Sequence, residues 1–179
     1  ILAIVGLVIS YRQHNKSKIG ELEIKDLSEE FDHQVRVLRD FNLSEEELKQ
    51  QAKAEKKAEK QKAKKRKEKL KKGETLDDEK KSCVYVLDFH GDISASETTA
   101  LREEISAILN VATPEDEVLL RLESPGGIVH DYGFAASQLS RLKQKGIKLT
   151  IAVDKVAASG GYMMACVADK IVSAPFAVI

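Results

Sequence analysis

The chain has 179 residues, of which 42% are hydrophobic and 32% charged, and its 29 basic side chains balance 29 acidic ones. This length accommodates one domain of ordinary size and an additional segment. Two cysteines, Cys83 and Cys166, are too few for a disulfide framework, which excludes the small disulfide-stabilised folds. The zero net charge conceals an asymmetry, because thirteen Lys or Arg and only three Glu lie between Lys49 and Lys72. The remainder of the chain is therefore acidic.

The first residues are apolar, from Ile1 to Ile9, and are followed by Ser10 and Tyr11. A helix that spans a bilayer needs roughly 20 apolar residues, so this run is too short to cross a membrane alone. We interpret residues 1–11 as the remnant of a transmembrane helix, with a buried N-terminal strand as the alternative. Tyr11 suits a membrane interface, and a positive flank follows at Arg12, His14, Lys16 and Lys18.

Residues 12–81 are predicted to form a helical and basic region that ends in a linker. The apolar residues Leu27 to Leu38 are spaced by four, four and three, which places them on one face of a helix. Ser44 to Glu47 has the pattern of a capping box and is predicted to open a second helix.

The basic segment at residues 49–72 has almost no apolar stripe, since only scattered alanines and Leu70 interrupt its charge. Such a segment cannot bury a face against a core, so it is predicted to be a solvated helix or a disordered spacer. Binding to anionic lipid headgroups is the main functional alternative, at roughly 1 kcal/mol per charge near a membrane. Nucleic-acid binding is not favoured, because no aromatic residues are interleaved with the charges.

Residues 82–179 alternate between short β-branched runs and amphipathic stretches. Strands are predicted at residues 84–89, 118–122, 148–153 and 170–173, and helices from a Ser94–Glu97 cap to Val111, at 130–145 and at 161–168. This alternation is typical of an α/β domain with a parallel sheet. Because the chain stops at Ile179 directly after an apolar run, we expect the domain to be incomplete.

Two glycine turns carry the chemistry. Ser124-Pro125-Gly126-Gly127 and Ala157-Ala158-Ser159-Gly160-Gly161 each follow a predicted strand, so both are expected at the carboxyl edge of the sheet. Glycine permits positive φ and close approach of another backbone, so the first turn is suited to present N–H groups. A serine in a small-residue turn at a helix start is exposed beside further N–H groups. Together the turns predict an oxyanion hole and a nucleophile for acyl transfer, most simply peptide hydrolysis.

Three motifs of the chain belong together. They are Val-Leu-Asp-Phe-His-Gly-Asp-Ile at 86–93, Arg-Leu-Glu-Ser-Pro-Gly-Gly at 121–127, and Asp-Lys-Val-Ala-Ala-Ser-Gly-Gly-Tyr-Met-Met-Ala at 154–165. In this combination and order, they resemble the signal-peptide-peptidase A family of serine proteases. The resemblance is strongest to a membrane-anchored branch of the family, in which a membrane helix, a basic segment and a protease domain follow in that order. It implies a Clp/crotonase-like parallel-sheet domain at residues 82–179, here truncated.

The resemblance also implies a Ser–Lys dyad with no cofactor and no metal. Ser159 would be the nucleophile, and the amides of Gly127 and Gly160 would form the oxyanion hole, with Gly126 as the alternative to Gly127. The general-base lysine would lie beyond Ile179, so the segment alone is expected to be inactive. Peptide or membrane-protein substrates and a homo-oligomer are implied as partners.

The localisation implied is the cell inner membrane with a single N-terminal anchor. The positive-inside rule would place the soluble domain in the cytoplasm, whereas related proteases often work outside the membrane, so the side stays open.

Two residues of this chain are alternatives to a general-base lysine beyond Ile179. Lys155 lies four residues before Ser159, but in a turn, and is expected to be a solvent-facing turn residue. His130 follows the Pro-Gly-Gly turn and is expected to be exposed and passive. The other histidines, His14, His33 and His90, are expected away from both turns.

Two alternative functions remain on the residues alone. One is a crotonase-type acyl-CoA enzyme that uses the same oxyanion turns without a nucleophile, and the other is a membrane-bound interaction module in which the basic segment does the work.

Overall fold

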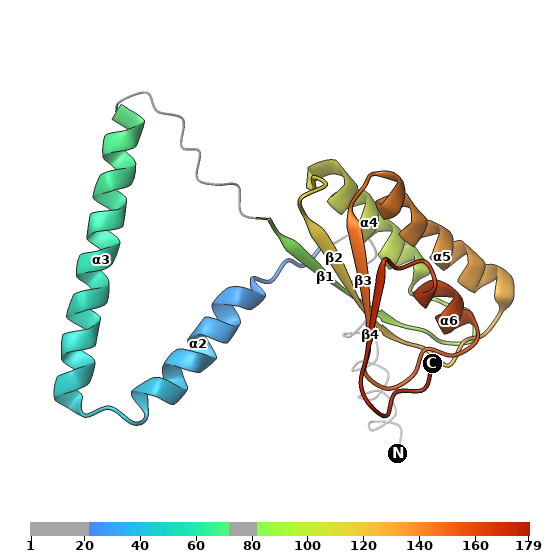
Figure 1. Ribbon diagram of the computed structural model, residues 1–179, viewed down its shortest axis with the longest axis horizontal. Coiled ribbons are helices and arrows are strands. Elements are labelled where there is room, and N and C mark those ends of the chain that lie inside the picture. The colour runs from blue at the N-terminus through green and yellow to red at the C-terminus, as the bar shows by residue number, and fades with distance from the viewer. Residues whose placement is uncertain (1–21, 72–81) are drawn as a thin grey trace, which may run out of the picture. The chain divides into compact units, whose positions relative to one another are not determined.

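The computed structural model describes residues 22–71 and 82–179 (Figure 1). These residues belong to two compact units, a helical one within Glu23–Lys81 and an α/β one that contains Ser82–Ile179. The interpretation of residues 1–11 as a transmembrane remnant concerns a segment outside the described residues. Across residues 22–71 and 82–179, no helix is both long enough and apolar enough to span a bilayer.

The helical unit begins with helix α2, Leu27–Asp40, as the apolar spacing predicts. Asp26 caps it, because its carboxylate accepts a hydrogen bond of 3.0 Å from the amide of Glu29. The apolar face does not enter a core: Phe31 is 63% exposed and Leu38 72% exposed. Amphipathic spacing therefore predicts the helix but not the burial of its face.

Helix α3, Glu45–Lys71, contains most of the basic segment. Its capping box forms as predicted, with the amide of Ser44 donating to Glu47 Oε2 at 2.9 Å and the Ser44 hydroxyl at 2.8 Å. These two hydrogen bonds lower the pKa of the Glu47 carboxyl, the one from the amide most. Of the two structures predicted for the segment, the helix is the one found.

The α/β unit contains a parallel sheet whose strands lie in chain order. The strands are β1 Val84–His90, β2 Glu117–Glu123, β3 Lys148–Val153 and β4 Lys170–Ser173. All three strand pairs are parallel, which confirms the α/β class and the four predicted strands. Parallel neighbours end at the same edge, so the chain leaves β1, β2 and β3 side by side.

Three helices cover one face of this sheet (Figure 1). They are α4 Thr98–Val111, α5 Val129–Gln144 and α6 Gly160–Ala165. A sequential strand order with right-handed crossovers places every connection on the same side. The core between the layers is made of the inward residues of the strands, such as Leu120 and Ile151, and of helix residues such as Leu101 and Leu139, all of which are buried.

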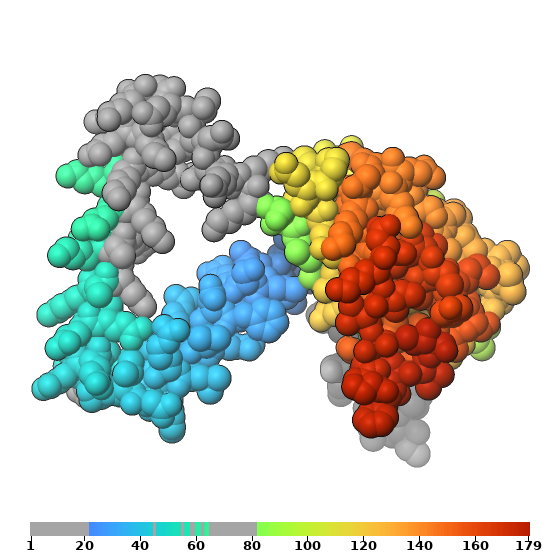
Figure 2. Space-filling model, viewed as in Figure 1, coloured from blue at the N-terminus to red at the C-terminus, as the bar shows by residue number. Residues whose placement is uncertain are grey.

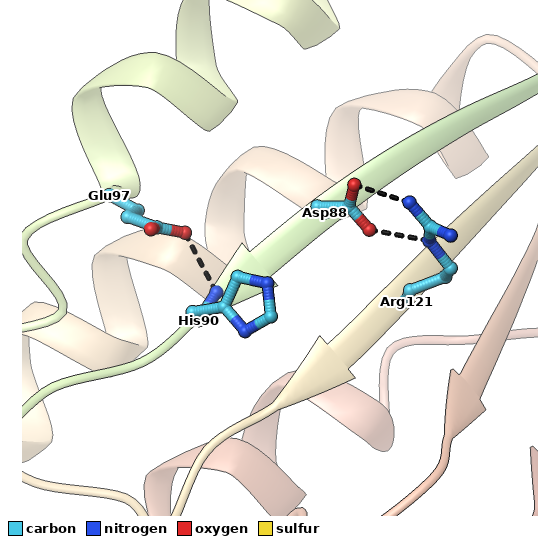
Figure 3. Close-up of polar contacts among 4 residues, drawn as sticks. All are labelled: Asp88, His90, Glu97 and Arg121. Carbon is cyan, nitrogen blue, oxygen red and sulfur yellow. Dashed lines mark hydrogen bonds and ion pairs between the residues drawn. The ribbon is translucent and has the colours of Figure 1, made fainter. Parts of the chain in front are cut away.

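The other face of the sheet carries charged pairs between neighbouring strands. Asp88 on β1 and Arg121 on β2 form two hydrogen bonds, of 2.5 and 2.6 Å (Figure 3). The carboxylate of Asp88 raises the pKa of Arg121 through this bidentate contact. Glu117 on β2 accepts hydrogen bonds from Thr150 at 2.6 Å and Lys148 at 3.3 Å. The period of two along β1 and β2 thus separates the core from a polar surface.

The last residues fold back along the surface. The amide of Val178 donates to Lys155 O, and the amide of Ala157 donates to Val178 O, at 2.9 and 2.8 Å. Figure 2 shows this C-terminal stretch on the outside of the α/β unit, where Phe176 is 97% exposed.

Two predicted helix boundaries are wrong. Helix α4 begins at Thr98 rather than at a Ser94 cap, because the Asp92 carboxylate accepts the amides of Ser94 and Ser96, at 3.1 and 2.9 Å, and closes a turn there. Helix α6 ends at Ala165, earlier than residue 168.

Two apolar residues of helix α4 differ in burial, so their replacement is predicted to have different effects on stability. Leu101 is 1% exposed and Val111 is 64% exposed. Leu101→Ala is expected to lower the free energy of unfolding by about 2–5 kcal/mol, because it leaves a cavity. Val111→Ala, the matched control, is expected to change it by less than about 0.5 kcal/mol. Urea unfolding followed by circular dichroism measures both, and equal losses would contradict this description of the core.

Candidate active site

The two glycine turns lie side by side at the carboxyl edge of the sheet. Strands β2 and β3 are paired neighbours, and their hydrogen bonding continues past their ends. The amide of Ser124 donates to Val156 O at 2.9 Å, and the amide of Ala158 donates to Ser124 O at 3.0 Å. These bonds hold the chain before Gly126 against the chain before Ser159.

Ser159 has a strained backbone. Its φ of 51° and ψ of −114° lie outside the regions that non-glycine residues prefer. In the described part of the chain, Ala95 is the one other non-glycine residue with positive φ. Such strain costs about 1–3 kcal/mol and persists where surrounding structure enforces it. The serine is exposed at the start of α6, and its side chain does not cap that helix.

Glycine is required where the turns meet. A Cβ atom at Gly126 would stand 2.6 Å from the Cβ of Ser159 and 2.7 Å from the nitrogen of Gly160, closer than real Cβ atoms come. Gly126 also has a φ of +89°, which favours glycine. A Cβ at Gly127 would collide with the carbonyl of Ile93. Backbone therefore lies directly against the serine.

The amides of the two turns differ in their hydrogen bonds. The amide of Gly126 donates to the Ser124 hydroxyl oxygen at 3.0 Å. The amides of Gly127 and Gly160 make no hydrogen bond to any described residue. Of the two glycines that the sequence left open, Gly127 is thus the one whose N–H group has no hydrogen-bond partner among the described residues.

A buried hydroxyl pair lies beneath the turns, and no sequence pattern indicated it. The hydroxyls of Ser124 and Tyr132 are 2.6 Å apart, and the Tyr132 hydroxyl donates to the carbonyl of Asp92 at 2.7 Å. Ser124 and Tyr132 are both fully buried. A tyrosine within an amphipathic helix is usually a core residue, so its polar contacts appear only in the folded chain.

The alternative bases have other partners. Lys155 is paired with Glu123 at 3.0 Å, across the ends of β3 and β2. The imidazole of His130 is 84% exposed and lies 3.4 Å from the Asp131 carboxylate. Within residues 22–71 and 82–179, neither of them makes a hydrogen bond to Ser159.

His90 lies nearer the turns than we expected. It ends β1 at the same carboxyl edge, in register with Glu123 of β2. Its amide donates to Glu97 Oε2 at 2.7 Å, next to the Asp88–Arg121 pair (Figure 3). The expectation that His90 lies away from both turns is therefore wrong for the first turn, because Glu123 directly precedes Ser124, whereas His33 lies on α2 in the helical unit.

Two family profiles match the chain. Residues 1–139 match Peptidase family S49 N-terminal, and residues 141–179 match Peptidase family S49. The chain belongs to peptidase family S49. The motifs that suggested a serine-protease family from sequence lie within these two matched regions.

Relatives in this family carry a protease name. The chain is 90% identical over all of its 179 residues to "Probable protease SohB" of Haemophilus influenzae, and covers 51% of that protein. It is 48% identical over the same length to the "Probable protease SohB" of Buchnera aphidicola subsp. Schlechtendalia chinensis, and covers 59% of it. The chain thus spans between half and three fifths of the length of these two S49 relatives.

The packing of the second turn predicts opposite effects at two glycines. A Cβ at Gly160 would collide with the Tyr132 ring, so Gly160→Ala is expected to lower the free energy of unfolding by about 1–3 kcal/mol. In the control, Gly133→Ala, the new Cβ meets nothing within 4 Å inside helix α5. It is expected to raise stability by up to about 1 kcal/mol. Urea unfolding measures both, and similar shifts at the two positions would contradict the contact.

Proposed function

We propose that this chain carries the nucleophile and the oxyanion hole of a membrane-anchored serine endopeptidase. Ser159 is the nucleophile, and the amides of Gly127 and Gly160 are the oxyanion donors. The observation that carries the proposal is the exposed serine at positive φ with Gly126 packed against its Cβ. Membership in peptidase family S49 supports the reaction class.

The reaction follows from these groups. Ser159 Oγ attacks the scissile carbonyl carbon as its proton passes to a base, and the carbonyl oxygen becomes an oxyanion. Two N–H groups at that oxygen stabilise the charge more in the transition state than in the substrate. Collapse of the tetrahedral intermediate releases the amine, which takes the proton, and water then hydrolyses the acyl-serine.

The proposal also includes the fold: we assign the α/β unit to the Clp/crotonase-like folds.

The base in this proposal is a lysine outside residues 1–179, which completes a Ser–Lys dyad. The pairing of Lys155 with Glu123 and of His130 with Asp131 supports a base from elsewhere. A lysine acts as a base only when neutral, so its pKa must be lowered, and burial does this by penalising the ammonium form.

The nucleophile assignment predicts the effect of one substitution. In the full-length protein, Ser159→Ala is expected to lower kcat for peptide hydrolysis at least about 10⁴-fold, as removal of a nucleophile does. It is also expected to abolish covalent labelling by a fluorophosphonate probe. The control Ser173→Ala removes an exposed hydroxyl on β4 and is expected to change neither. Labelling that persists in the Ser159 variant would contradict the assignment.

The same experiment separates the alternatives. Acyl-CoA turnover that survives Ser159→Ala would favour a crotonase-type enzyme. Function that survives Ser159→Ala but is lost on deletion of residues 45–72 would favour an interaction module.

We further propose that helix α3 binds anionic lipid headgroups at the inner membrane, where a membrane anchor of which residues 1–11 are interpreted as the remnant would hold the protein. Lys53, Lys56, Lys57, Lys60 and Lys64 line one exposed side of the helix. Their spacing of three and four residues forms a continuous cationic stripe. Homo-oligomerisation and membrane-protein substrates remain predictions from the family resemblance.

Lysine substitutions test this stripe. Replacement of its five lysines by glutamine is expected to weaken binding to phosphatidylglycerol vesicles by at least about 100-fold, because each charge contributes roughly 1 kcal/mol at an anionic surface. Binding of the unaltered protein should also fall as salt rises. Phosphatidylcholine vesicles are the control, and equal binding of the two proteins to anionic vesicles would contradict the proposal.

A further inference from the structure

A series of hydrogen bonds in the interior links the Ser124–Gly127 turn after β2 to the loop after β1. The amide of Gly126 donates to Ser124 Oγ at 3.0 Å, Ser124 Oγ lies 2.6 Å from the Tyr132 hydroxyl, and that hydroxyl donates to Asp92 O at 2.7 Å. Ser124 and Tyr132 are both 0% exposed. The two bonds of Ser124 are buried and the bond to Asp92 O is partly buried, so water competes little for them and each partner depends on the next.

The chemistry of the groups determines which one is the donor and which the acceptor in each of these three hydrogen bonds. A carbonyl oxygen only accepts, so the single hydrogen of the Tyr132 hydroxyl goes to Asp92 O. The single hydrogen of the Ser124 hydroxyl must then go to Tyr132, and its lone pair accepts the Gly126 amide. The donors therefore all point from the turn towards Asp92.

The ring of Tyr132 supports the second turn as well. A Cβ at Gly160 would collide with this ring, and a Cβ at Gly91 would collide with the Tyr132 and Ser124 hydroxyls. The ring also packs edge-on against Phe89 of β1, with 6.5 Å between centroids. One side chain of helix α5 thus contacts the backbone beside Ser159 and, through Ser124, the backbone of the oxyanion turn.

We propose that Tyr132 is a positioning residue for peptide hydrolysis, because its hydroxyl holds Ser124, and through it the Gly126 amide, one residue before the Gly127 amide, in place opposite Ser159. The inference rests on the function proposed above. An oxyanion donor works only within about 2.7–3.1 Å of the developing charge. Tyr132 does not touch the substrate; it restricts the backbone that carries the Gly127 amide.

The test removes the hydroxyl and keeps the ring. In the full-length protein, Tyr132→Phe is expected to lower kcat about 10-fold to 100-fold and to leave KM within about two-fold, because the oxyanion forms only after binding. A peptide aldehyde, whose adduct with the serine carries the oxyanion, should bind more weakly by a similar factor. The control is Tyr85→Phe, near the amino end of β1, which is expected to change none of these values.

A second variant tests the relay separately. Ser124→Ala removes the link between Tyr132 and Gly126, so it should produce a loss of the same kind. The double variant should be little worse than either single one, because the two hydroxyls act as one unit. Amide hydrogen exchange in residues 124–128 should also speed up in Tyr132→Phe, a readout that does not depend on catalysis.

Three results would overturn the inference. One is unchanged kcat and exchange in Tyr132→Phe. Another is an equal fall of kcat in Tyr85→Phe, and the last is a loss in KM alone. Each can occur while Ser159→Ala still abolishes hydrolysis, which leaves the proposed function standing. Hydrolysis that survives Ser159→Ala overturns the proposed function, and the catalytic role of Tyr132 with it.

Discussion

Backbone lies against backbone where the turn after β2 meets the turn after β3, and this contact constrains the rest of the site. Gly126 has no side chain, so the chain approaches Ser159 to a distance that a Cβ atom would forbid. The parallel pairing of the two strands brings their ends together, and two further hydrogen bonds extend that pairing into the turns. The positive φ of Ser159 is maintained because the backbone on both sides of it is held by these neighbours.

The loop after a third strand, β1, supports the two glycine turns from below. The loop after β1 supplies the Asp92 carbonyl for Tyr132 and the Ile93 carbonyl for the amide of Ile128, at 2.7 and 2.8 Å. The Asp92 carboxylate accepts hydrogen bonds from the amides of Ser96 and Ser94; these bonds, the one from Ser96 most, lower the pKa of Asp92 and stabilise the loop itself. The exposed turns therefore stand on a buried polar network whose donors and acceptors are matched. Such a network has few alternative arrangements, which suits a site that must hold N–H groups in a fixed direction.

The two units use their charges differently. In the α/β unit, acidic and basic side chains pair across neighbouring strands, as Asp88 does with Arg121 and Glu123 with Lys155. In helix α3 the lysines form a stripe without an equal number of acidic partners, which favours an external anionic surface. The balanced total charge of this S49 member therefore combines an acidic α/β unit, in which some charges are paired across strands, with one strongly basic helix.

The sequence alone determined the strands, the order of the elements, the α3 capping box and the place of both turns, because these depend on local periodicity and on turn chemistry. It also brought Ser159 and the glycines to one edge of the sheet, since parallel strands end together. Only the tertiary structure decided that Gly126 is hydrogen-bonded whereas Gly127 has no partner among the described residues, that Tyr132 supports the turns, and that His90 lies at the same edge. The tertiary structure alone also showed that the apolar face of α2 is exposed and that α4 begins at Thr98. The reason is physical: a local pattern reports which face of an element is apolar, but hydrogen-bond partners and burial depend on residues that are distant in the chain.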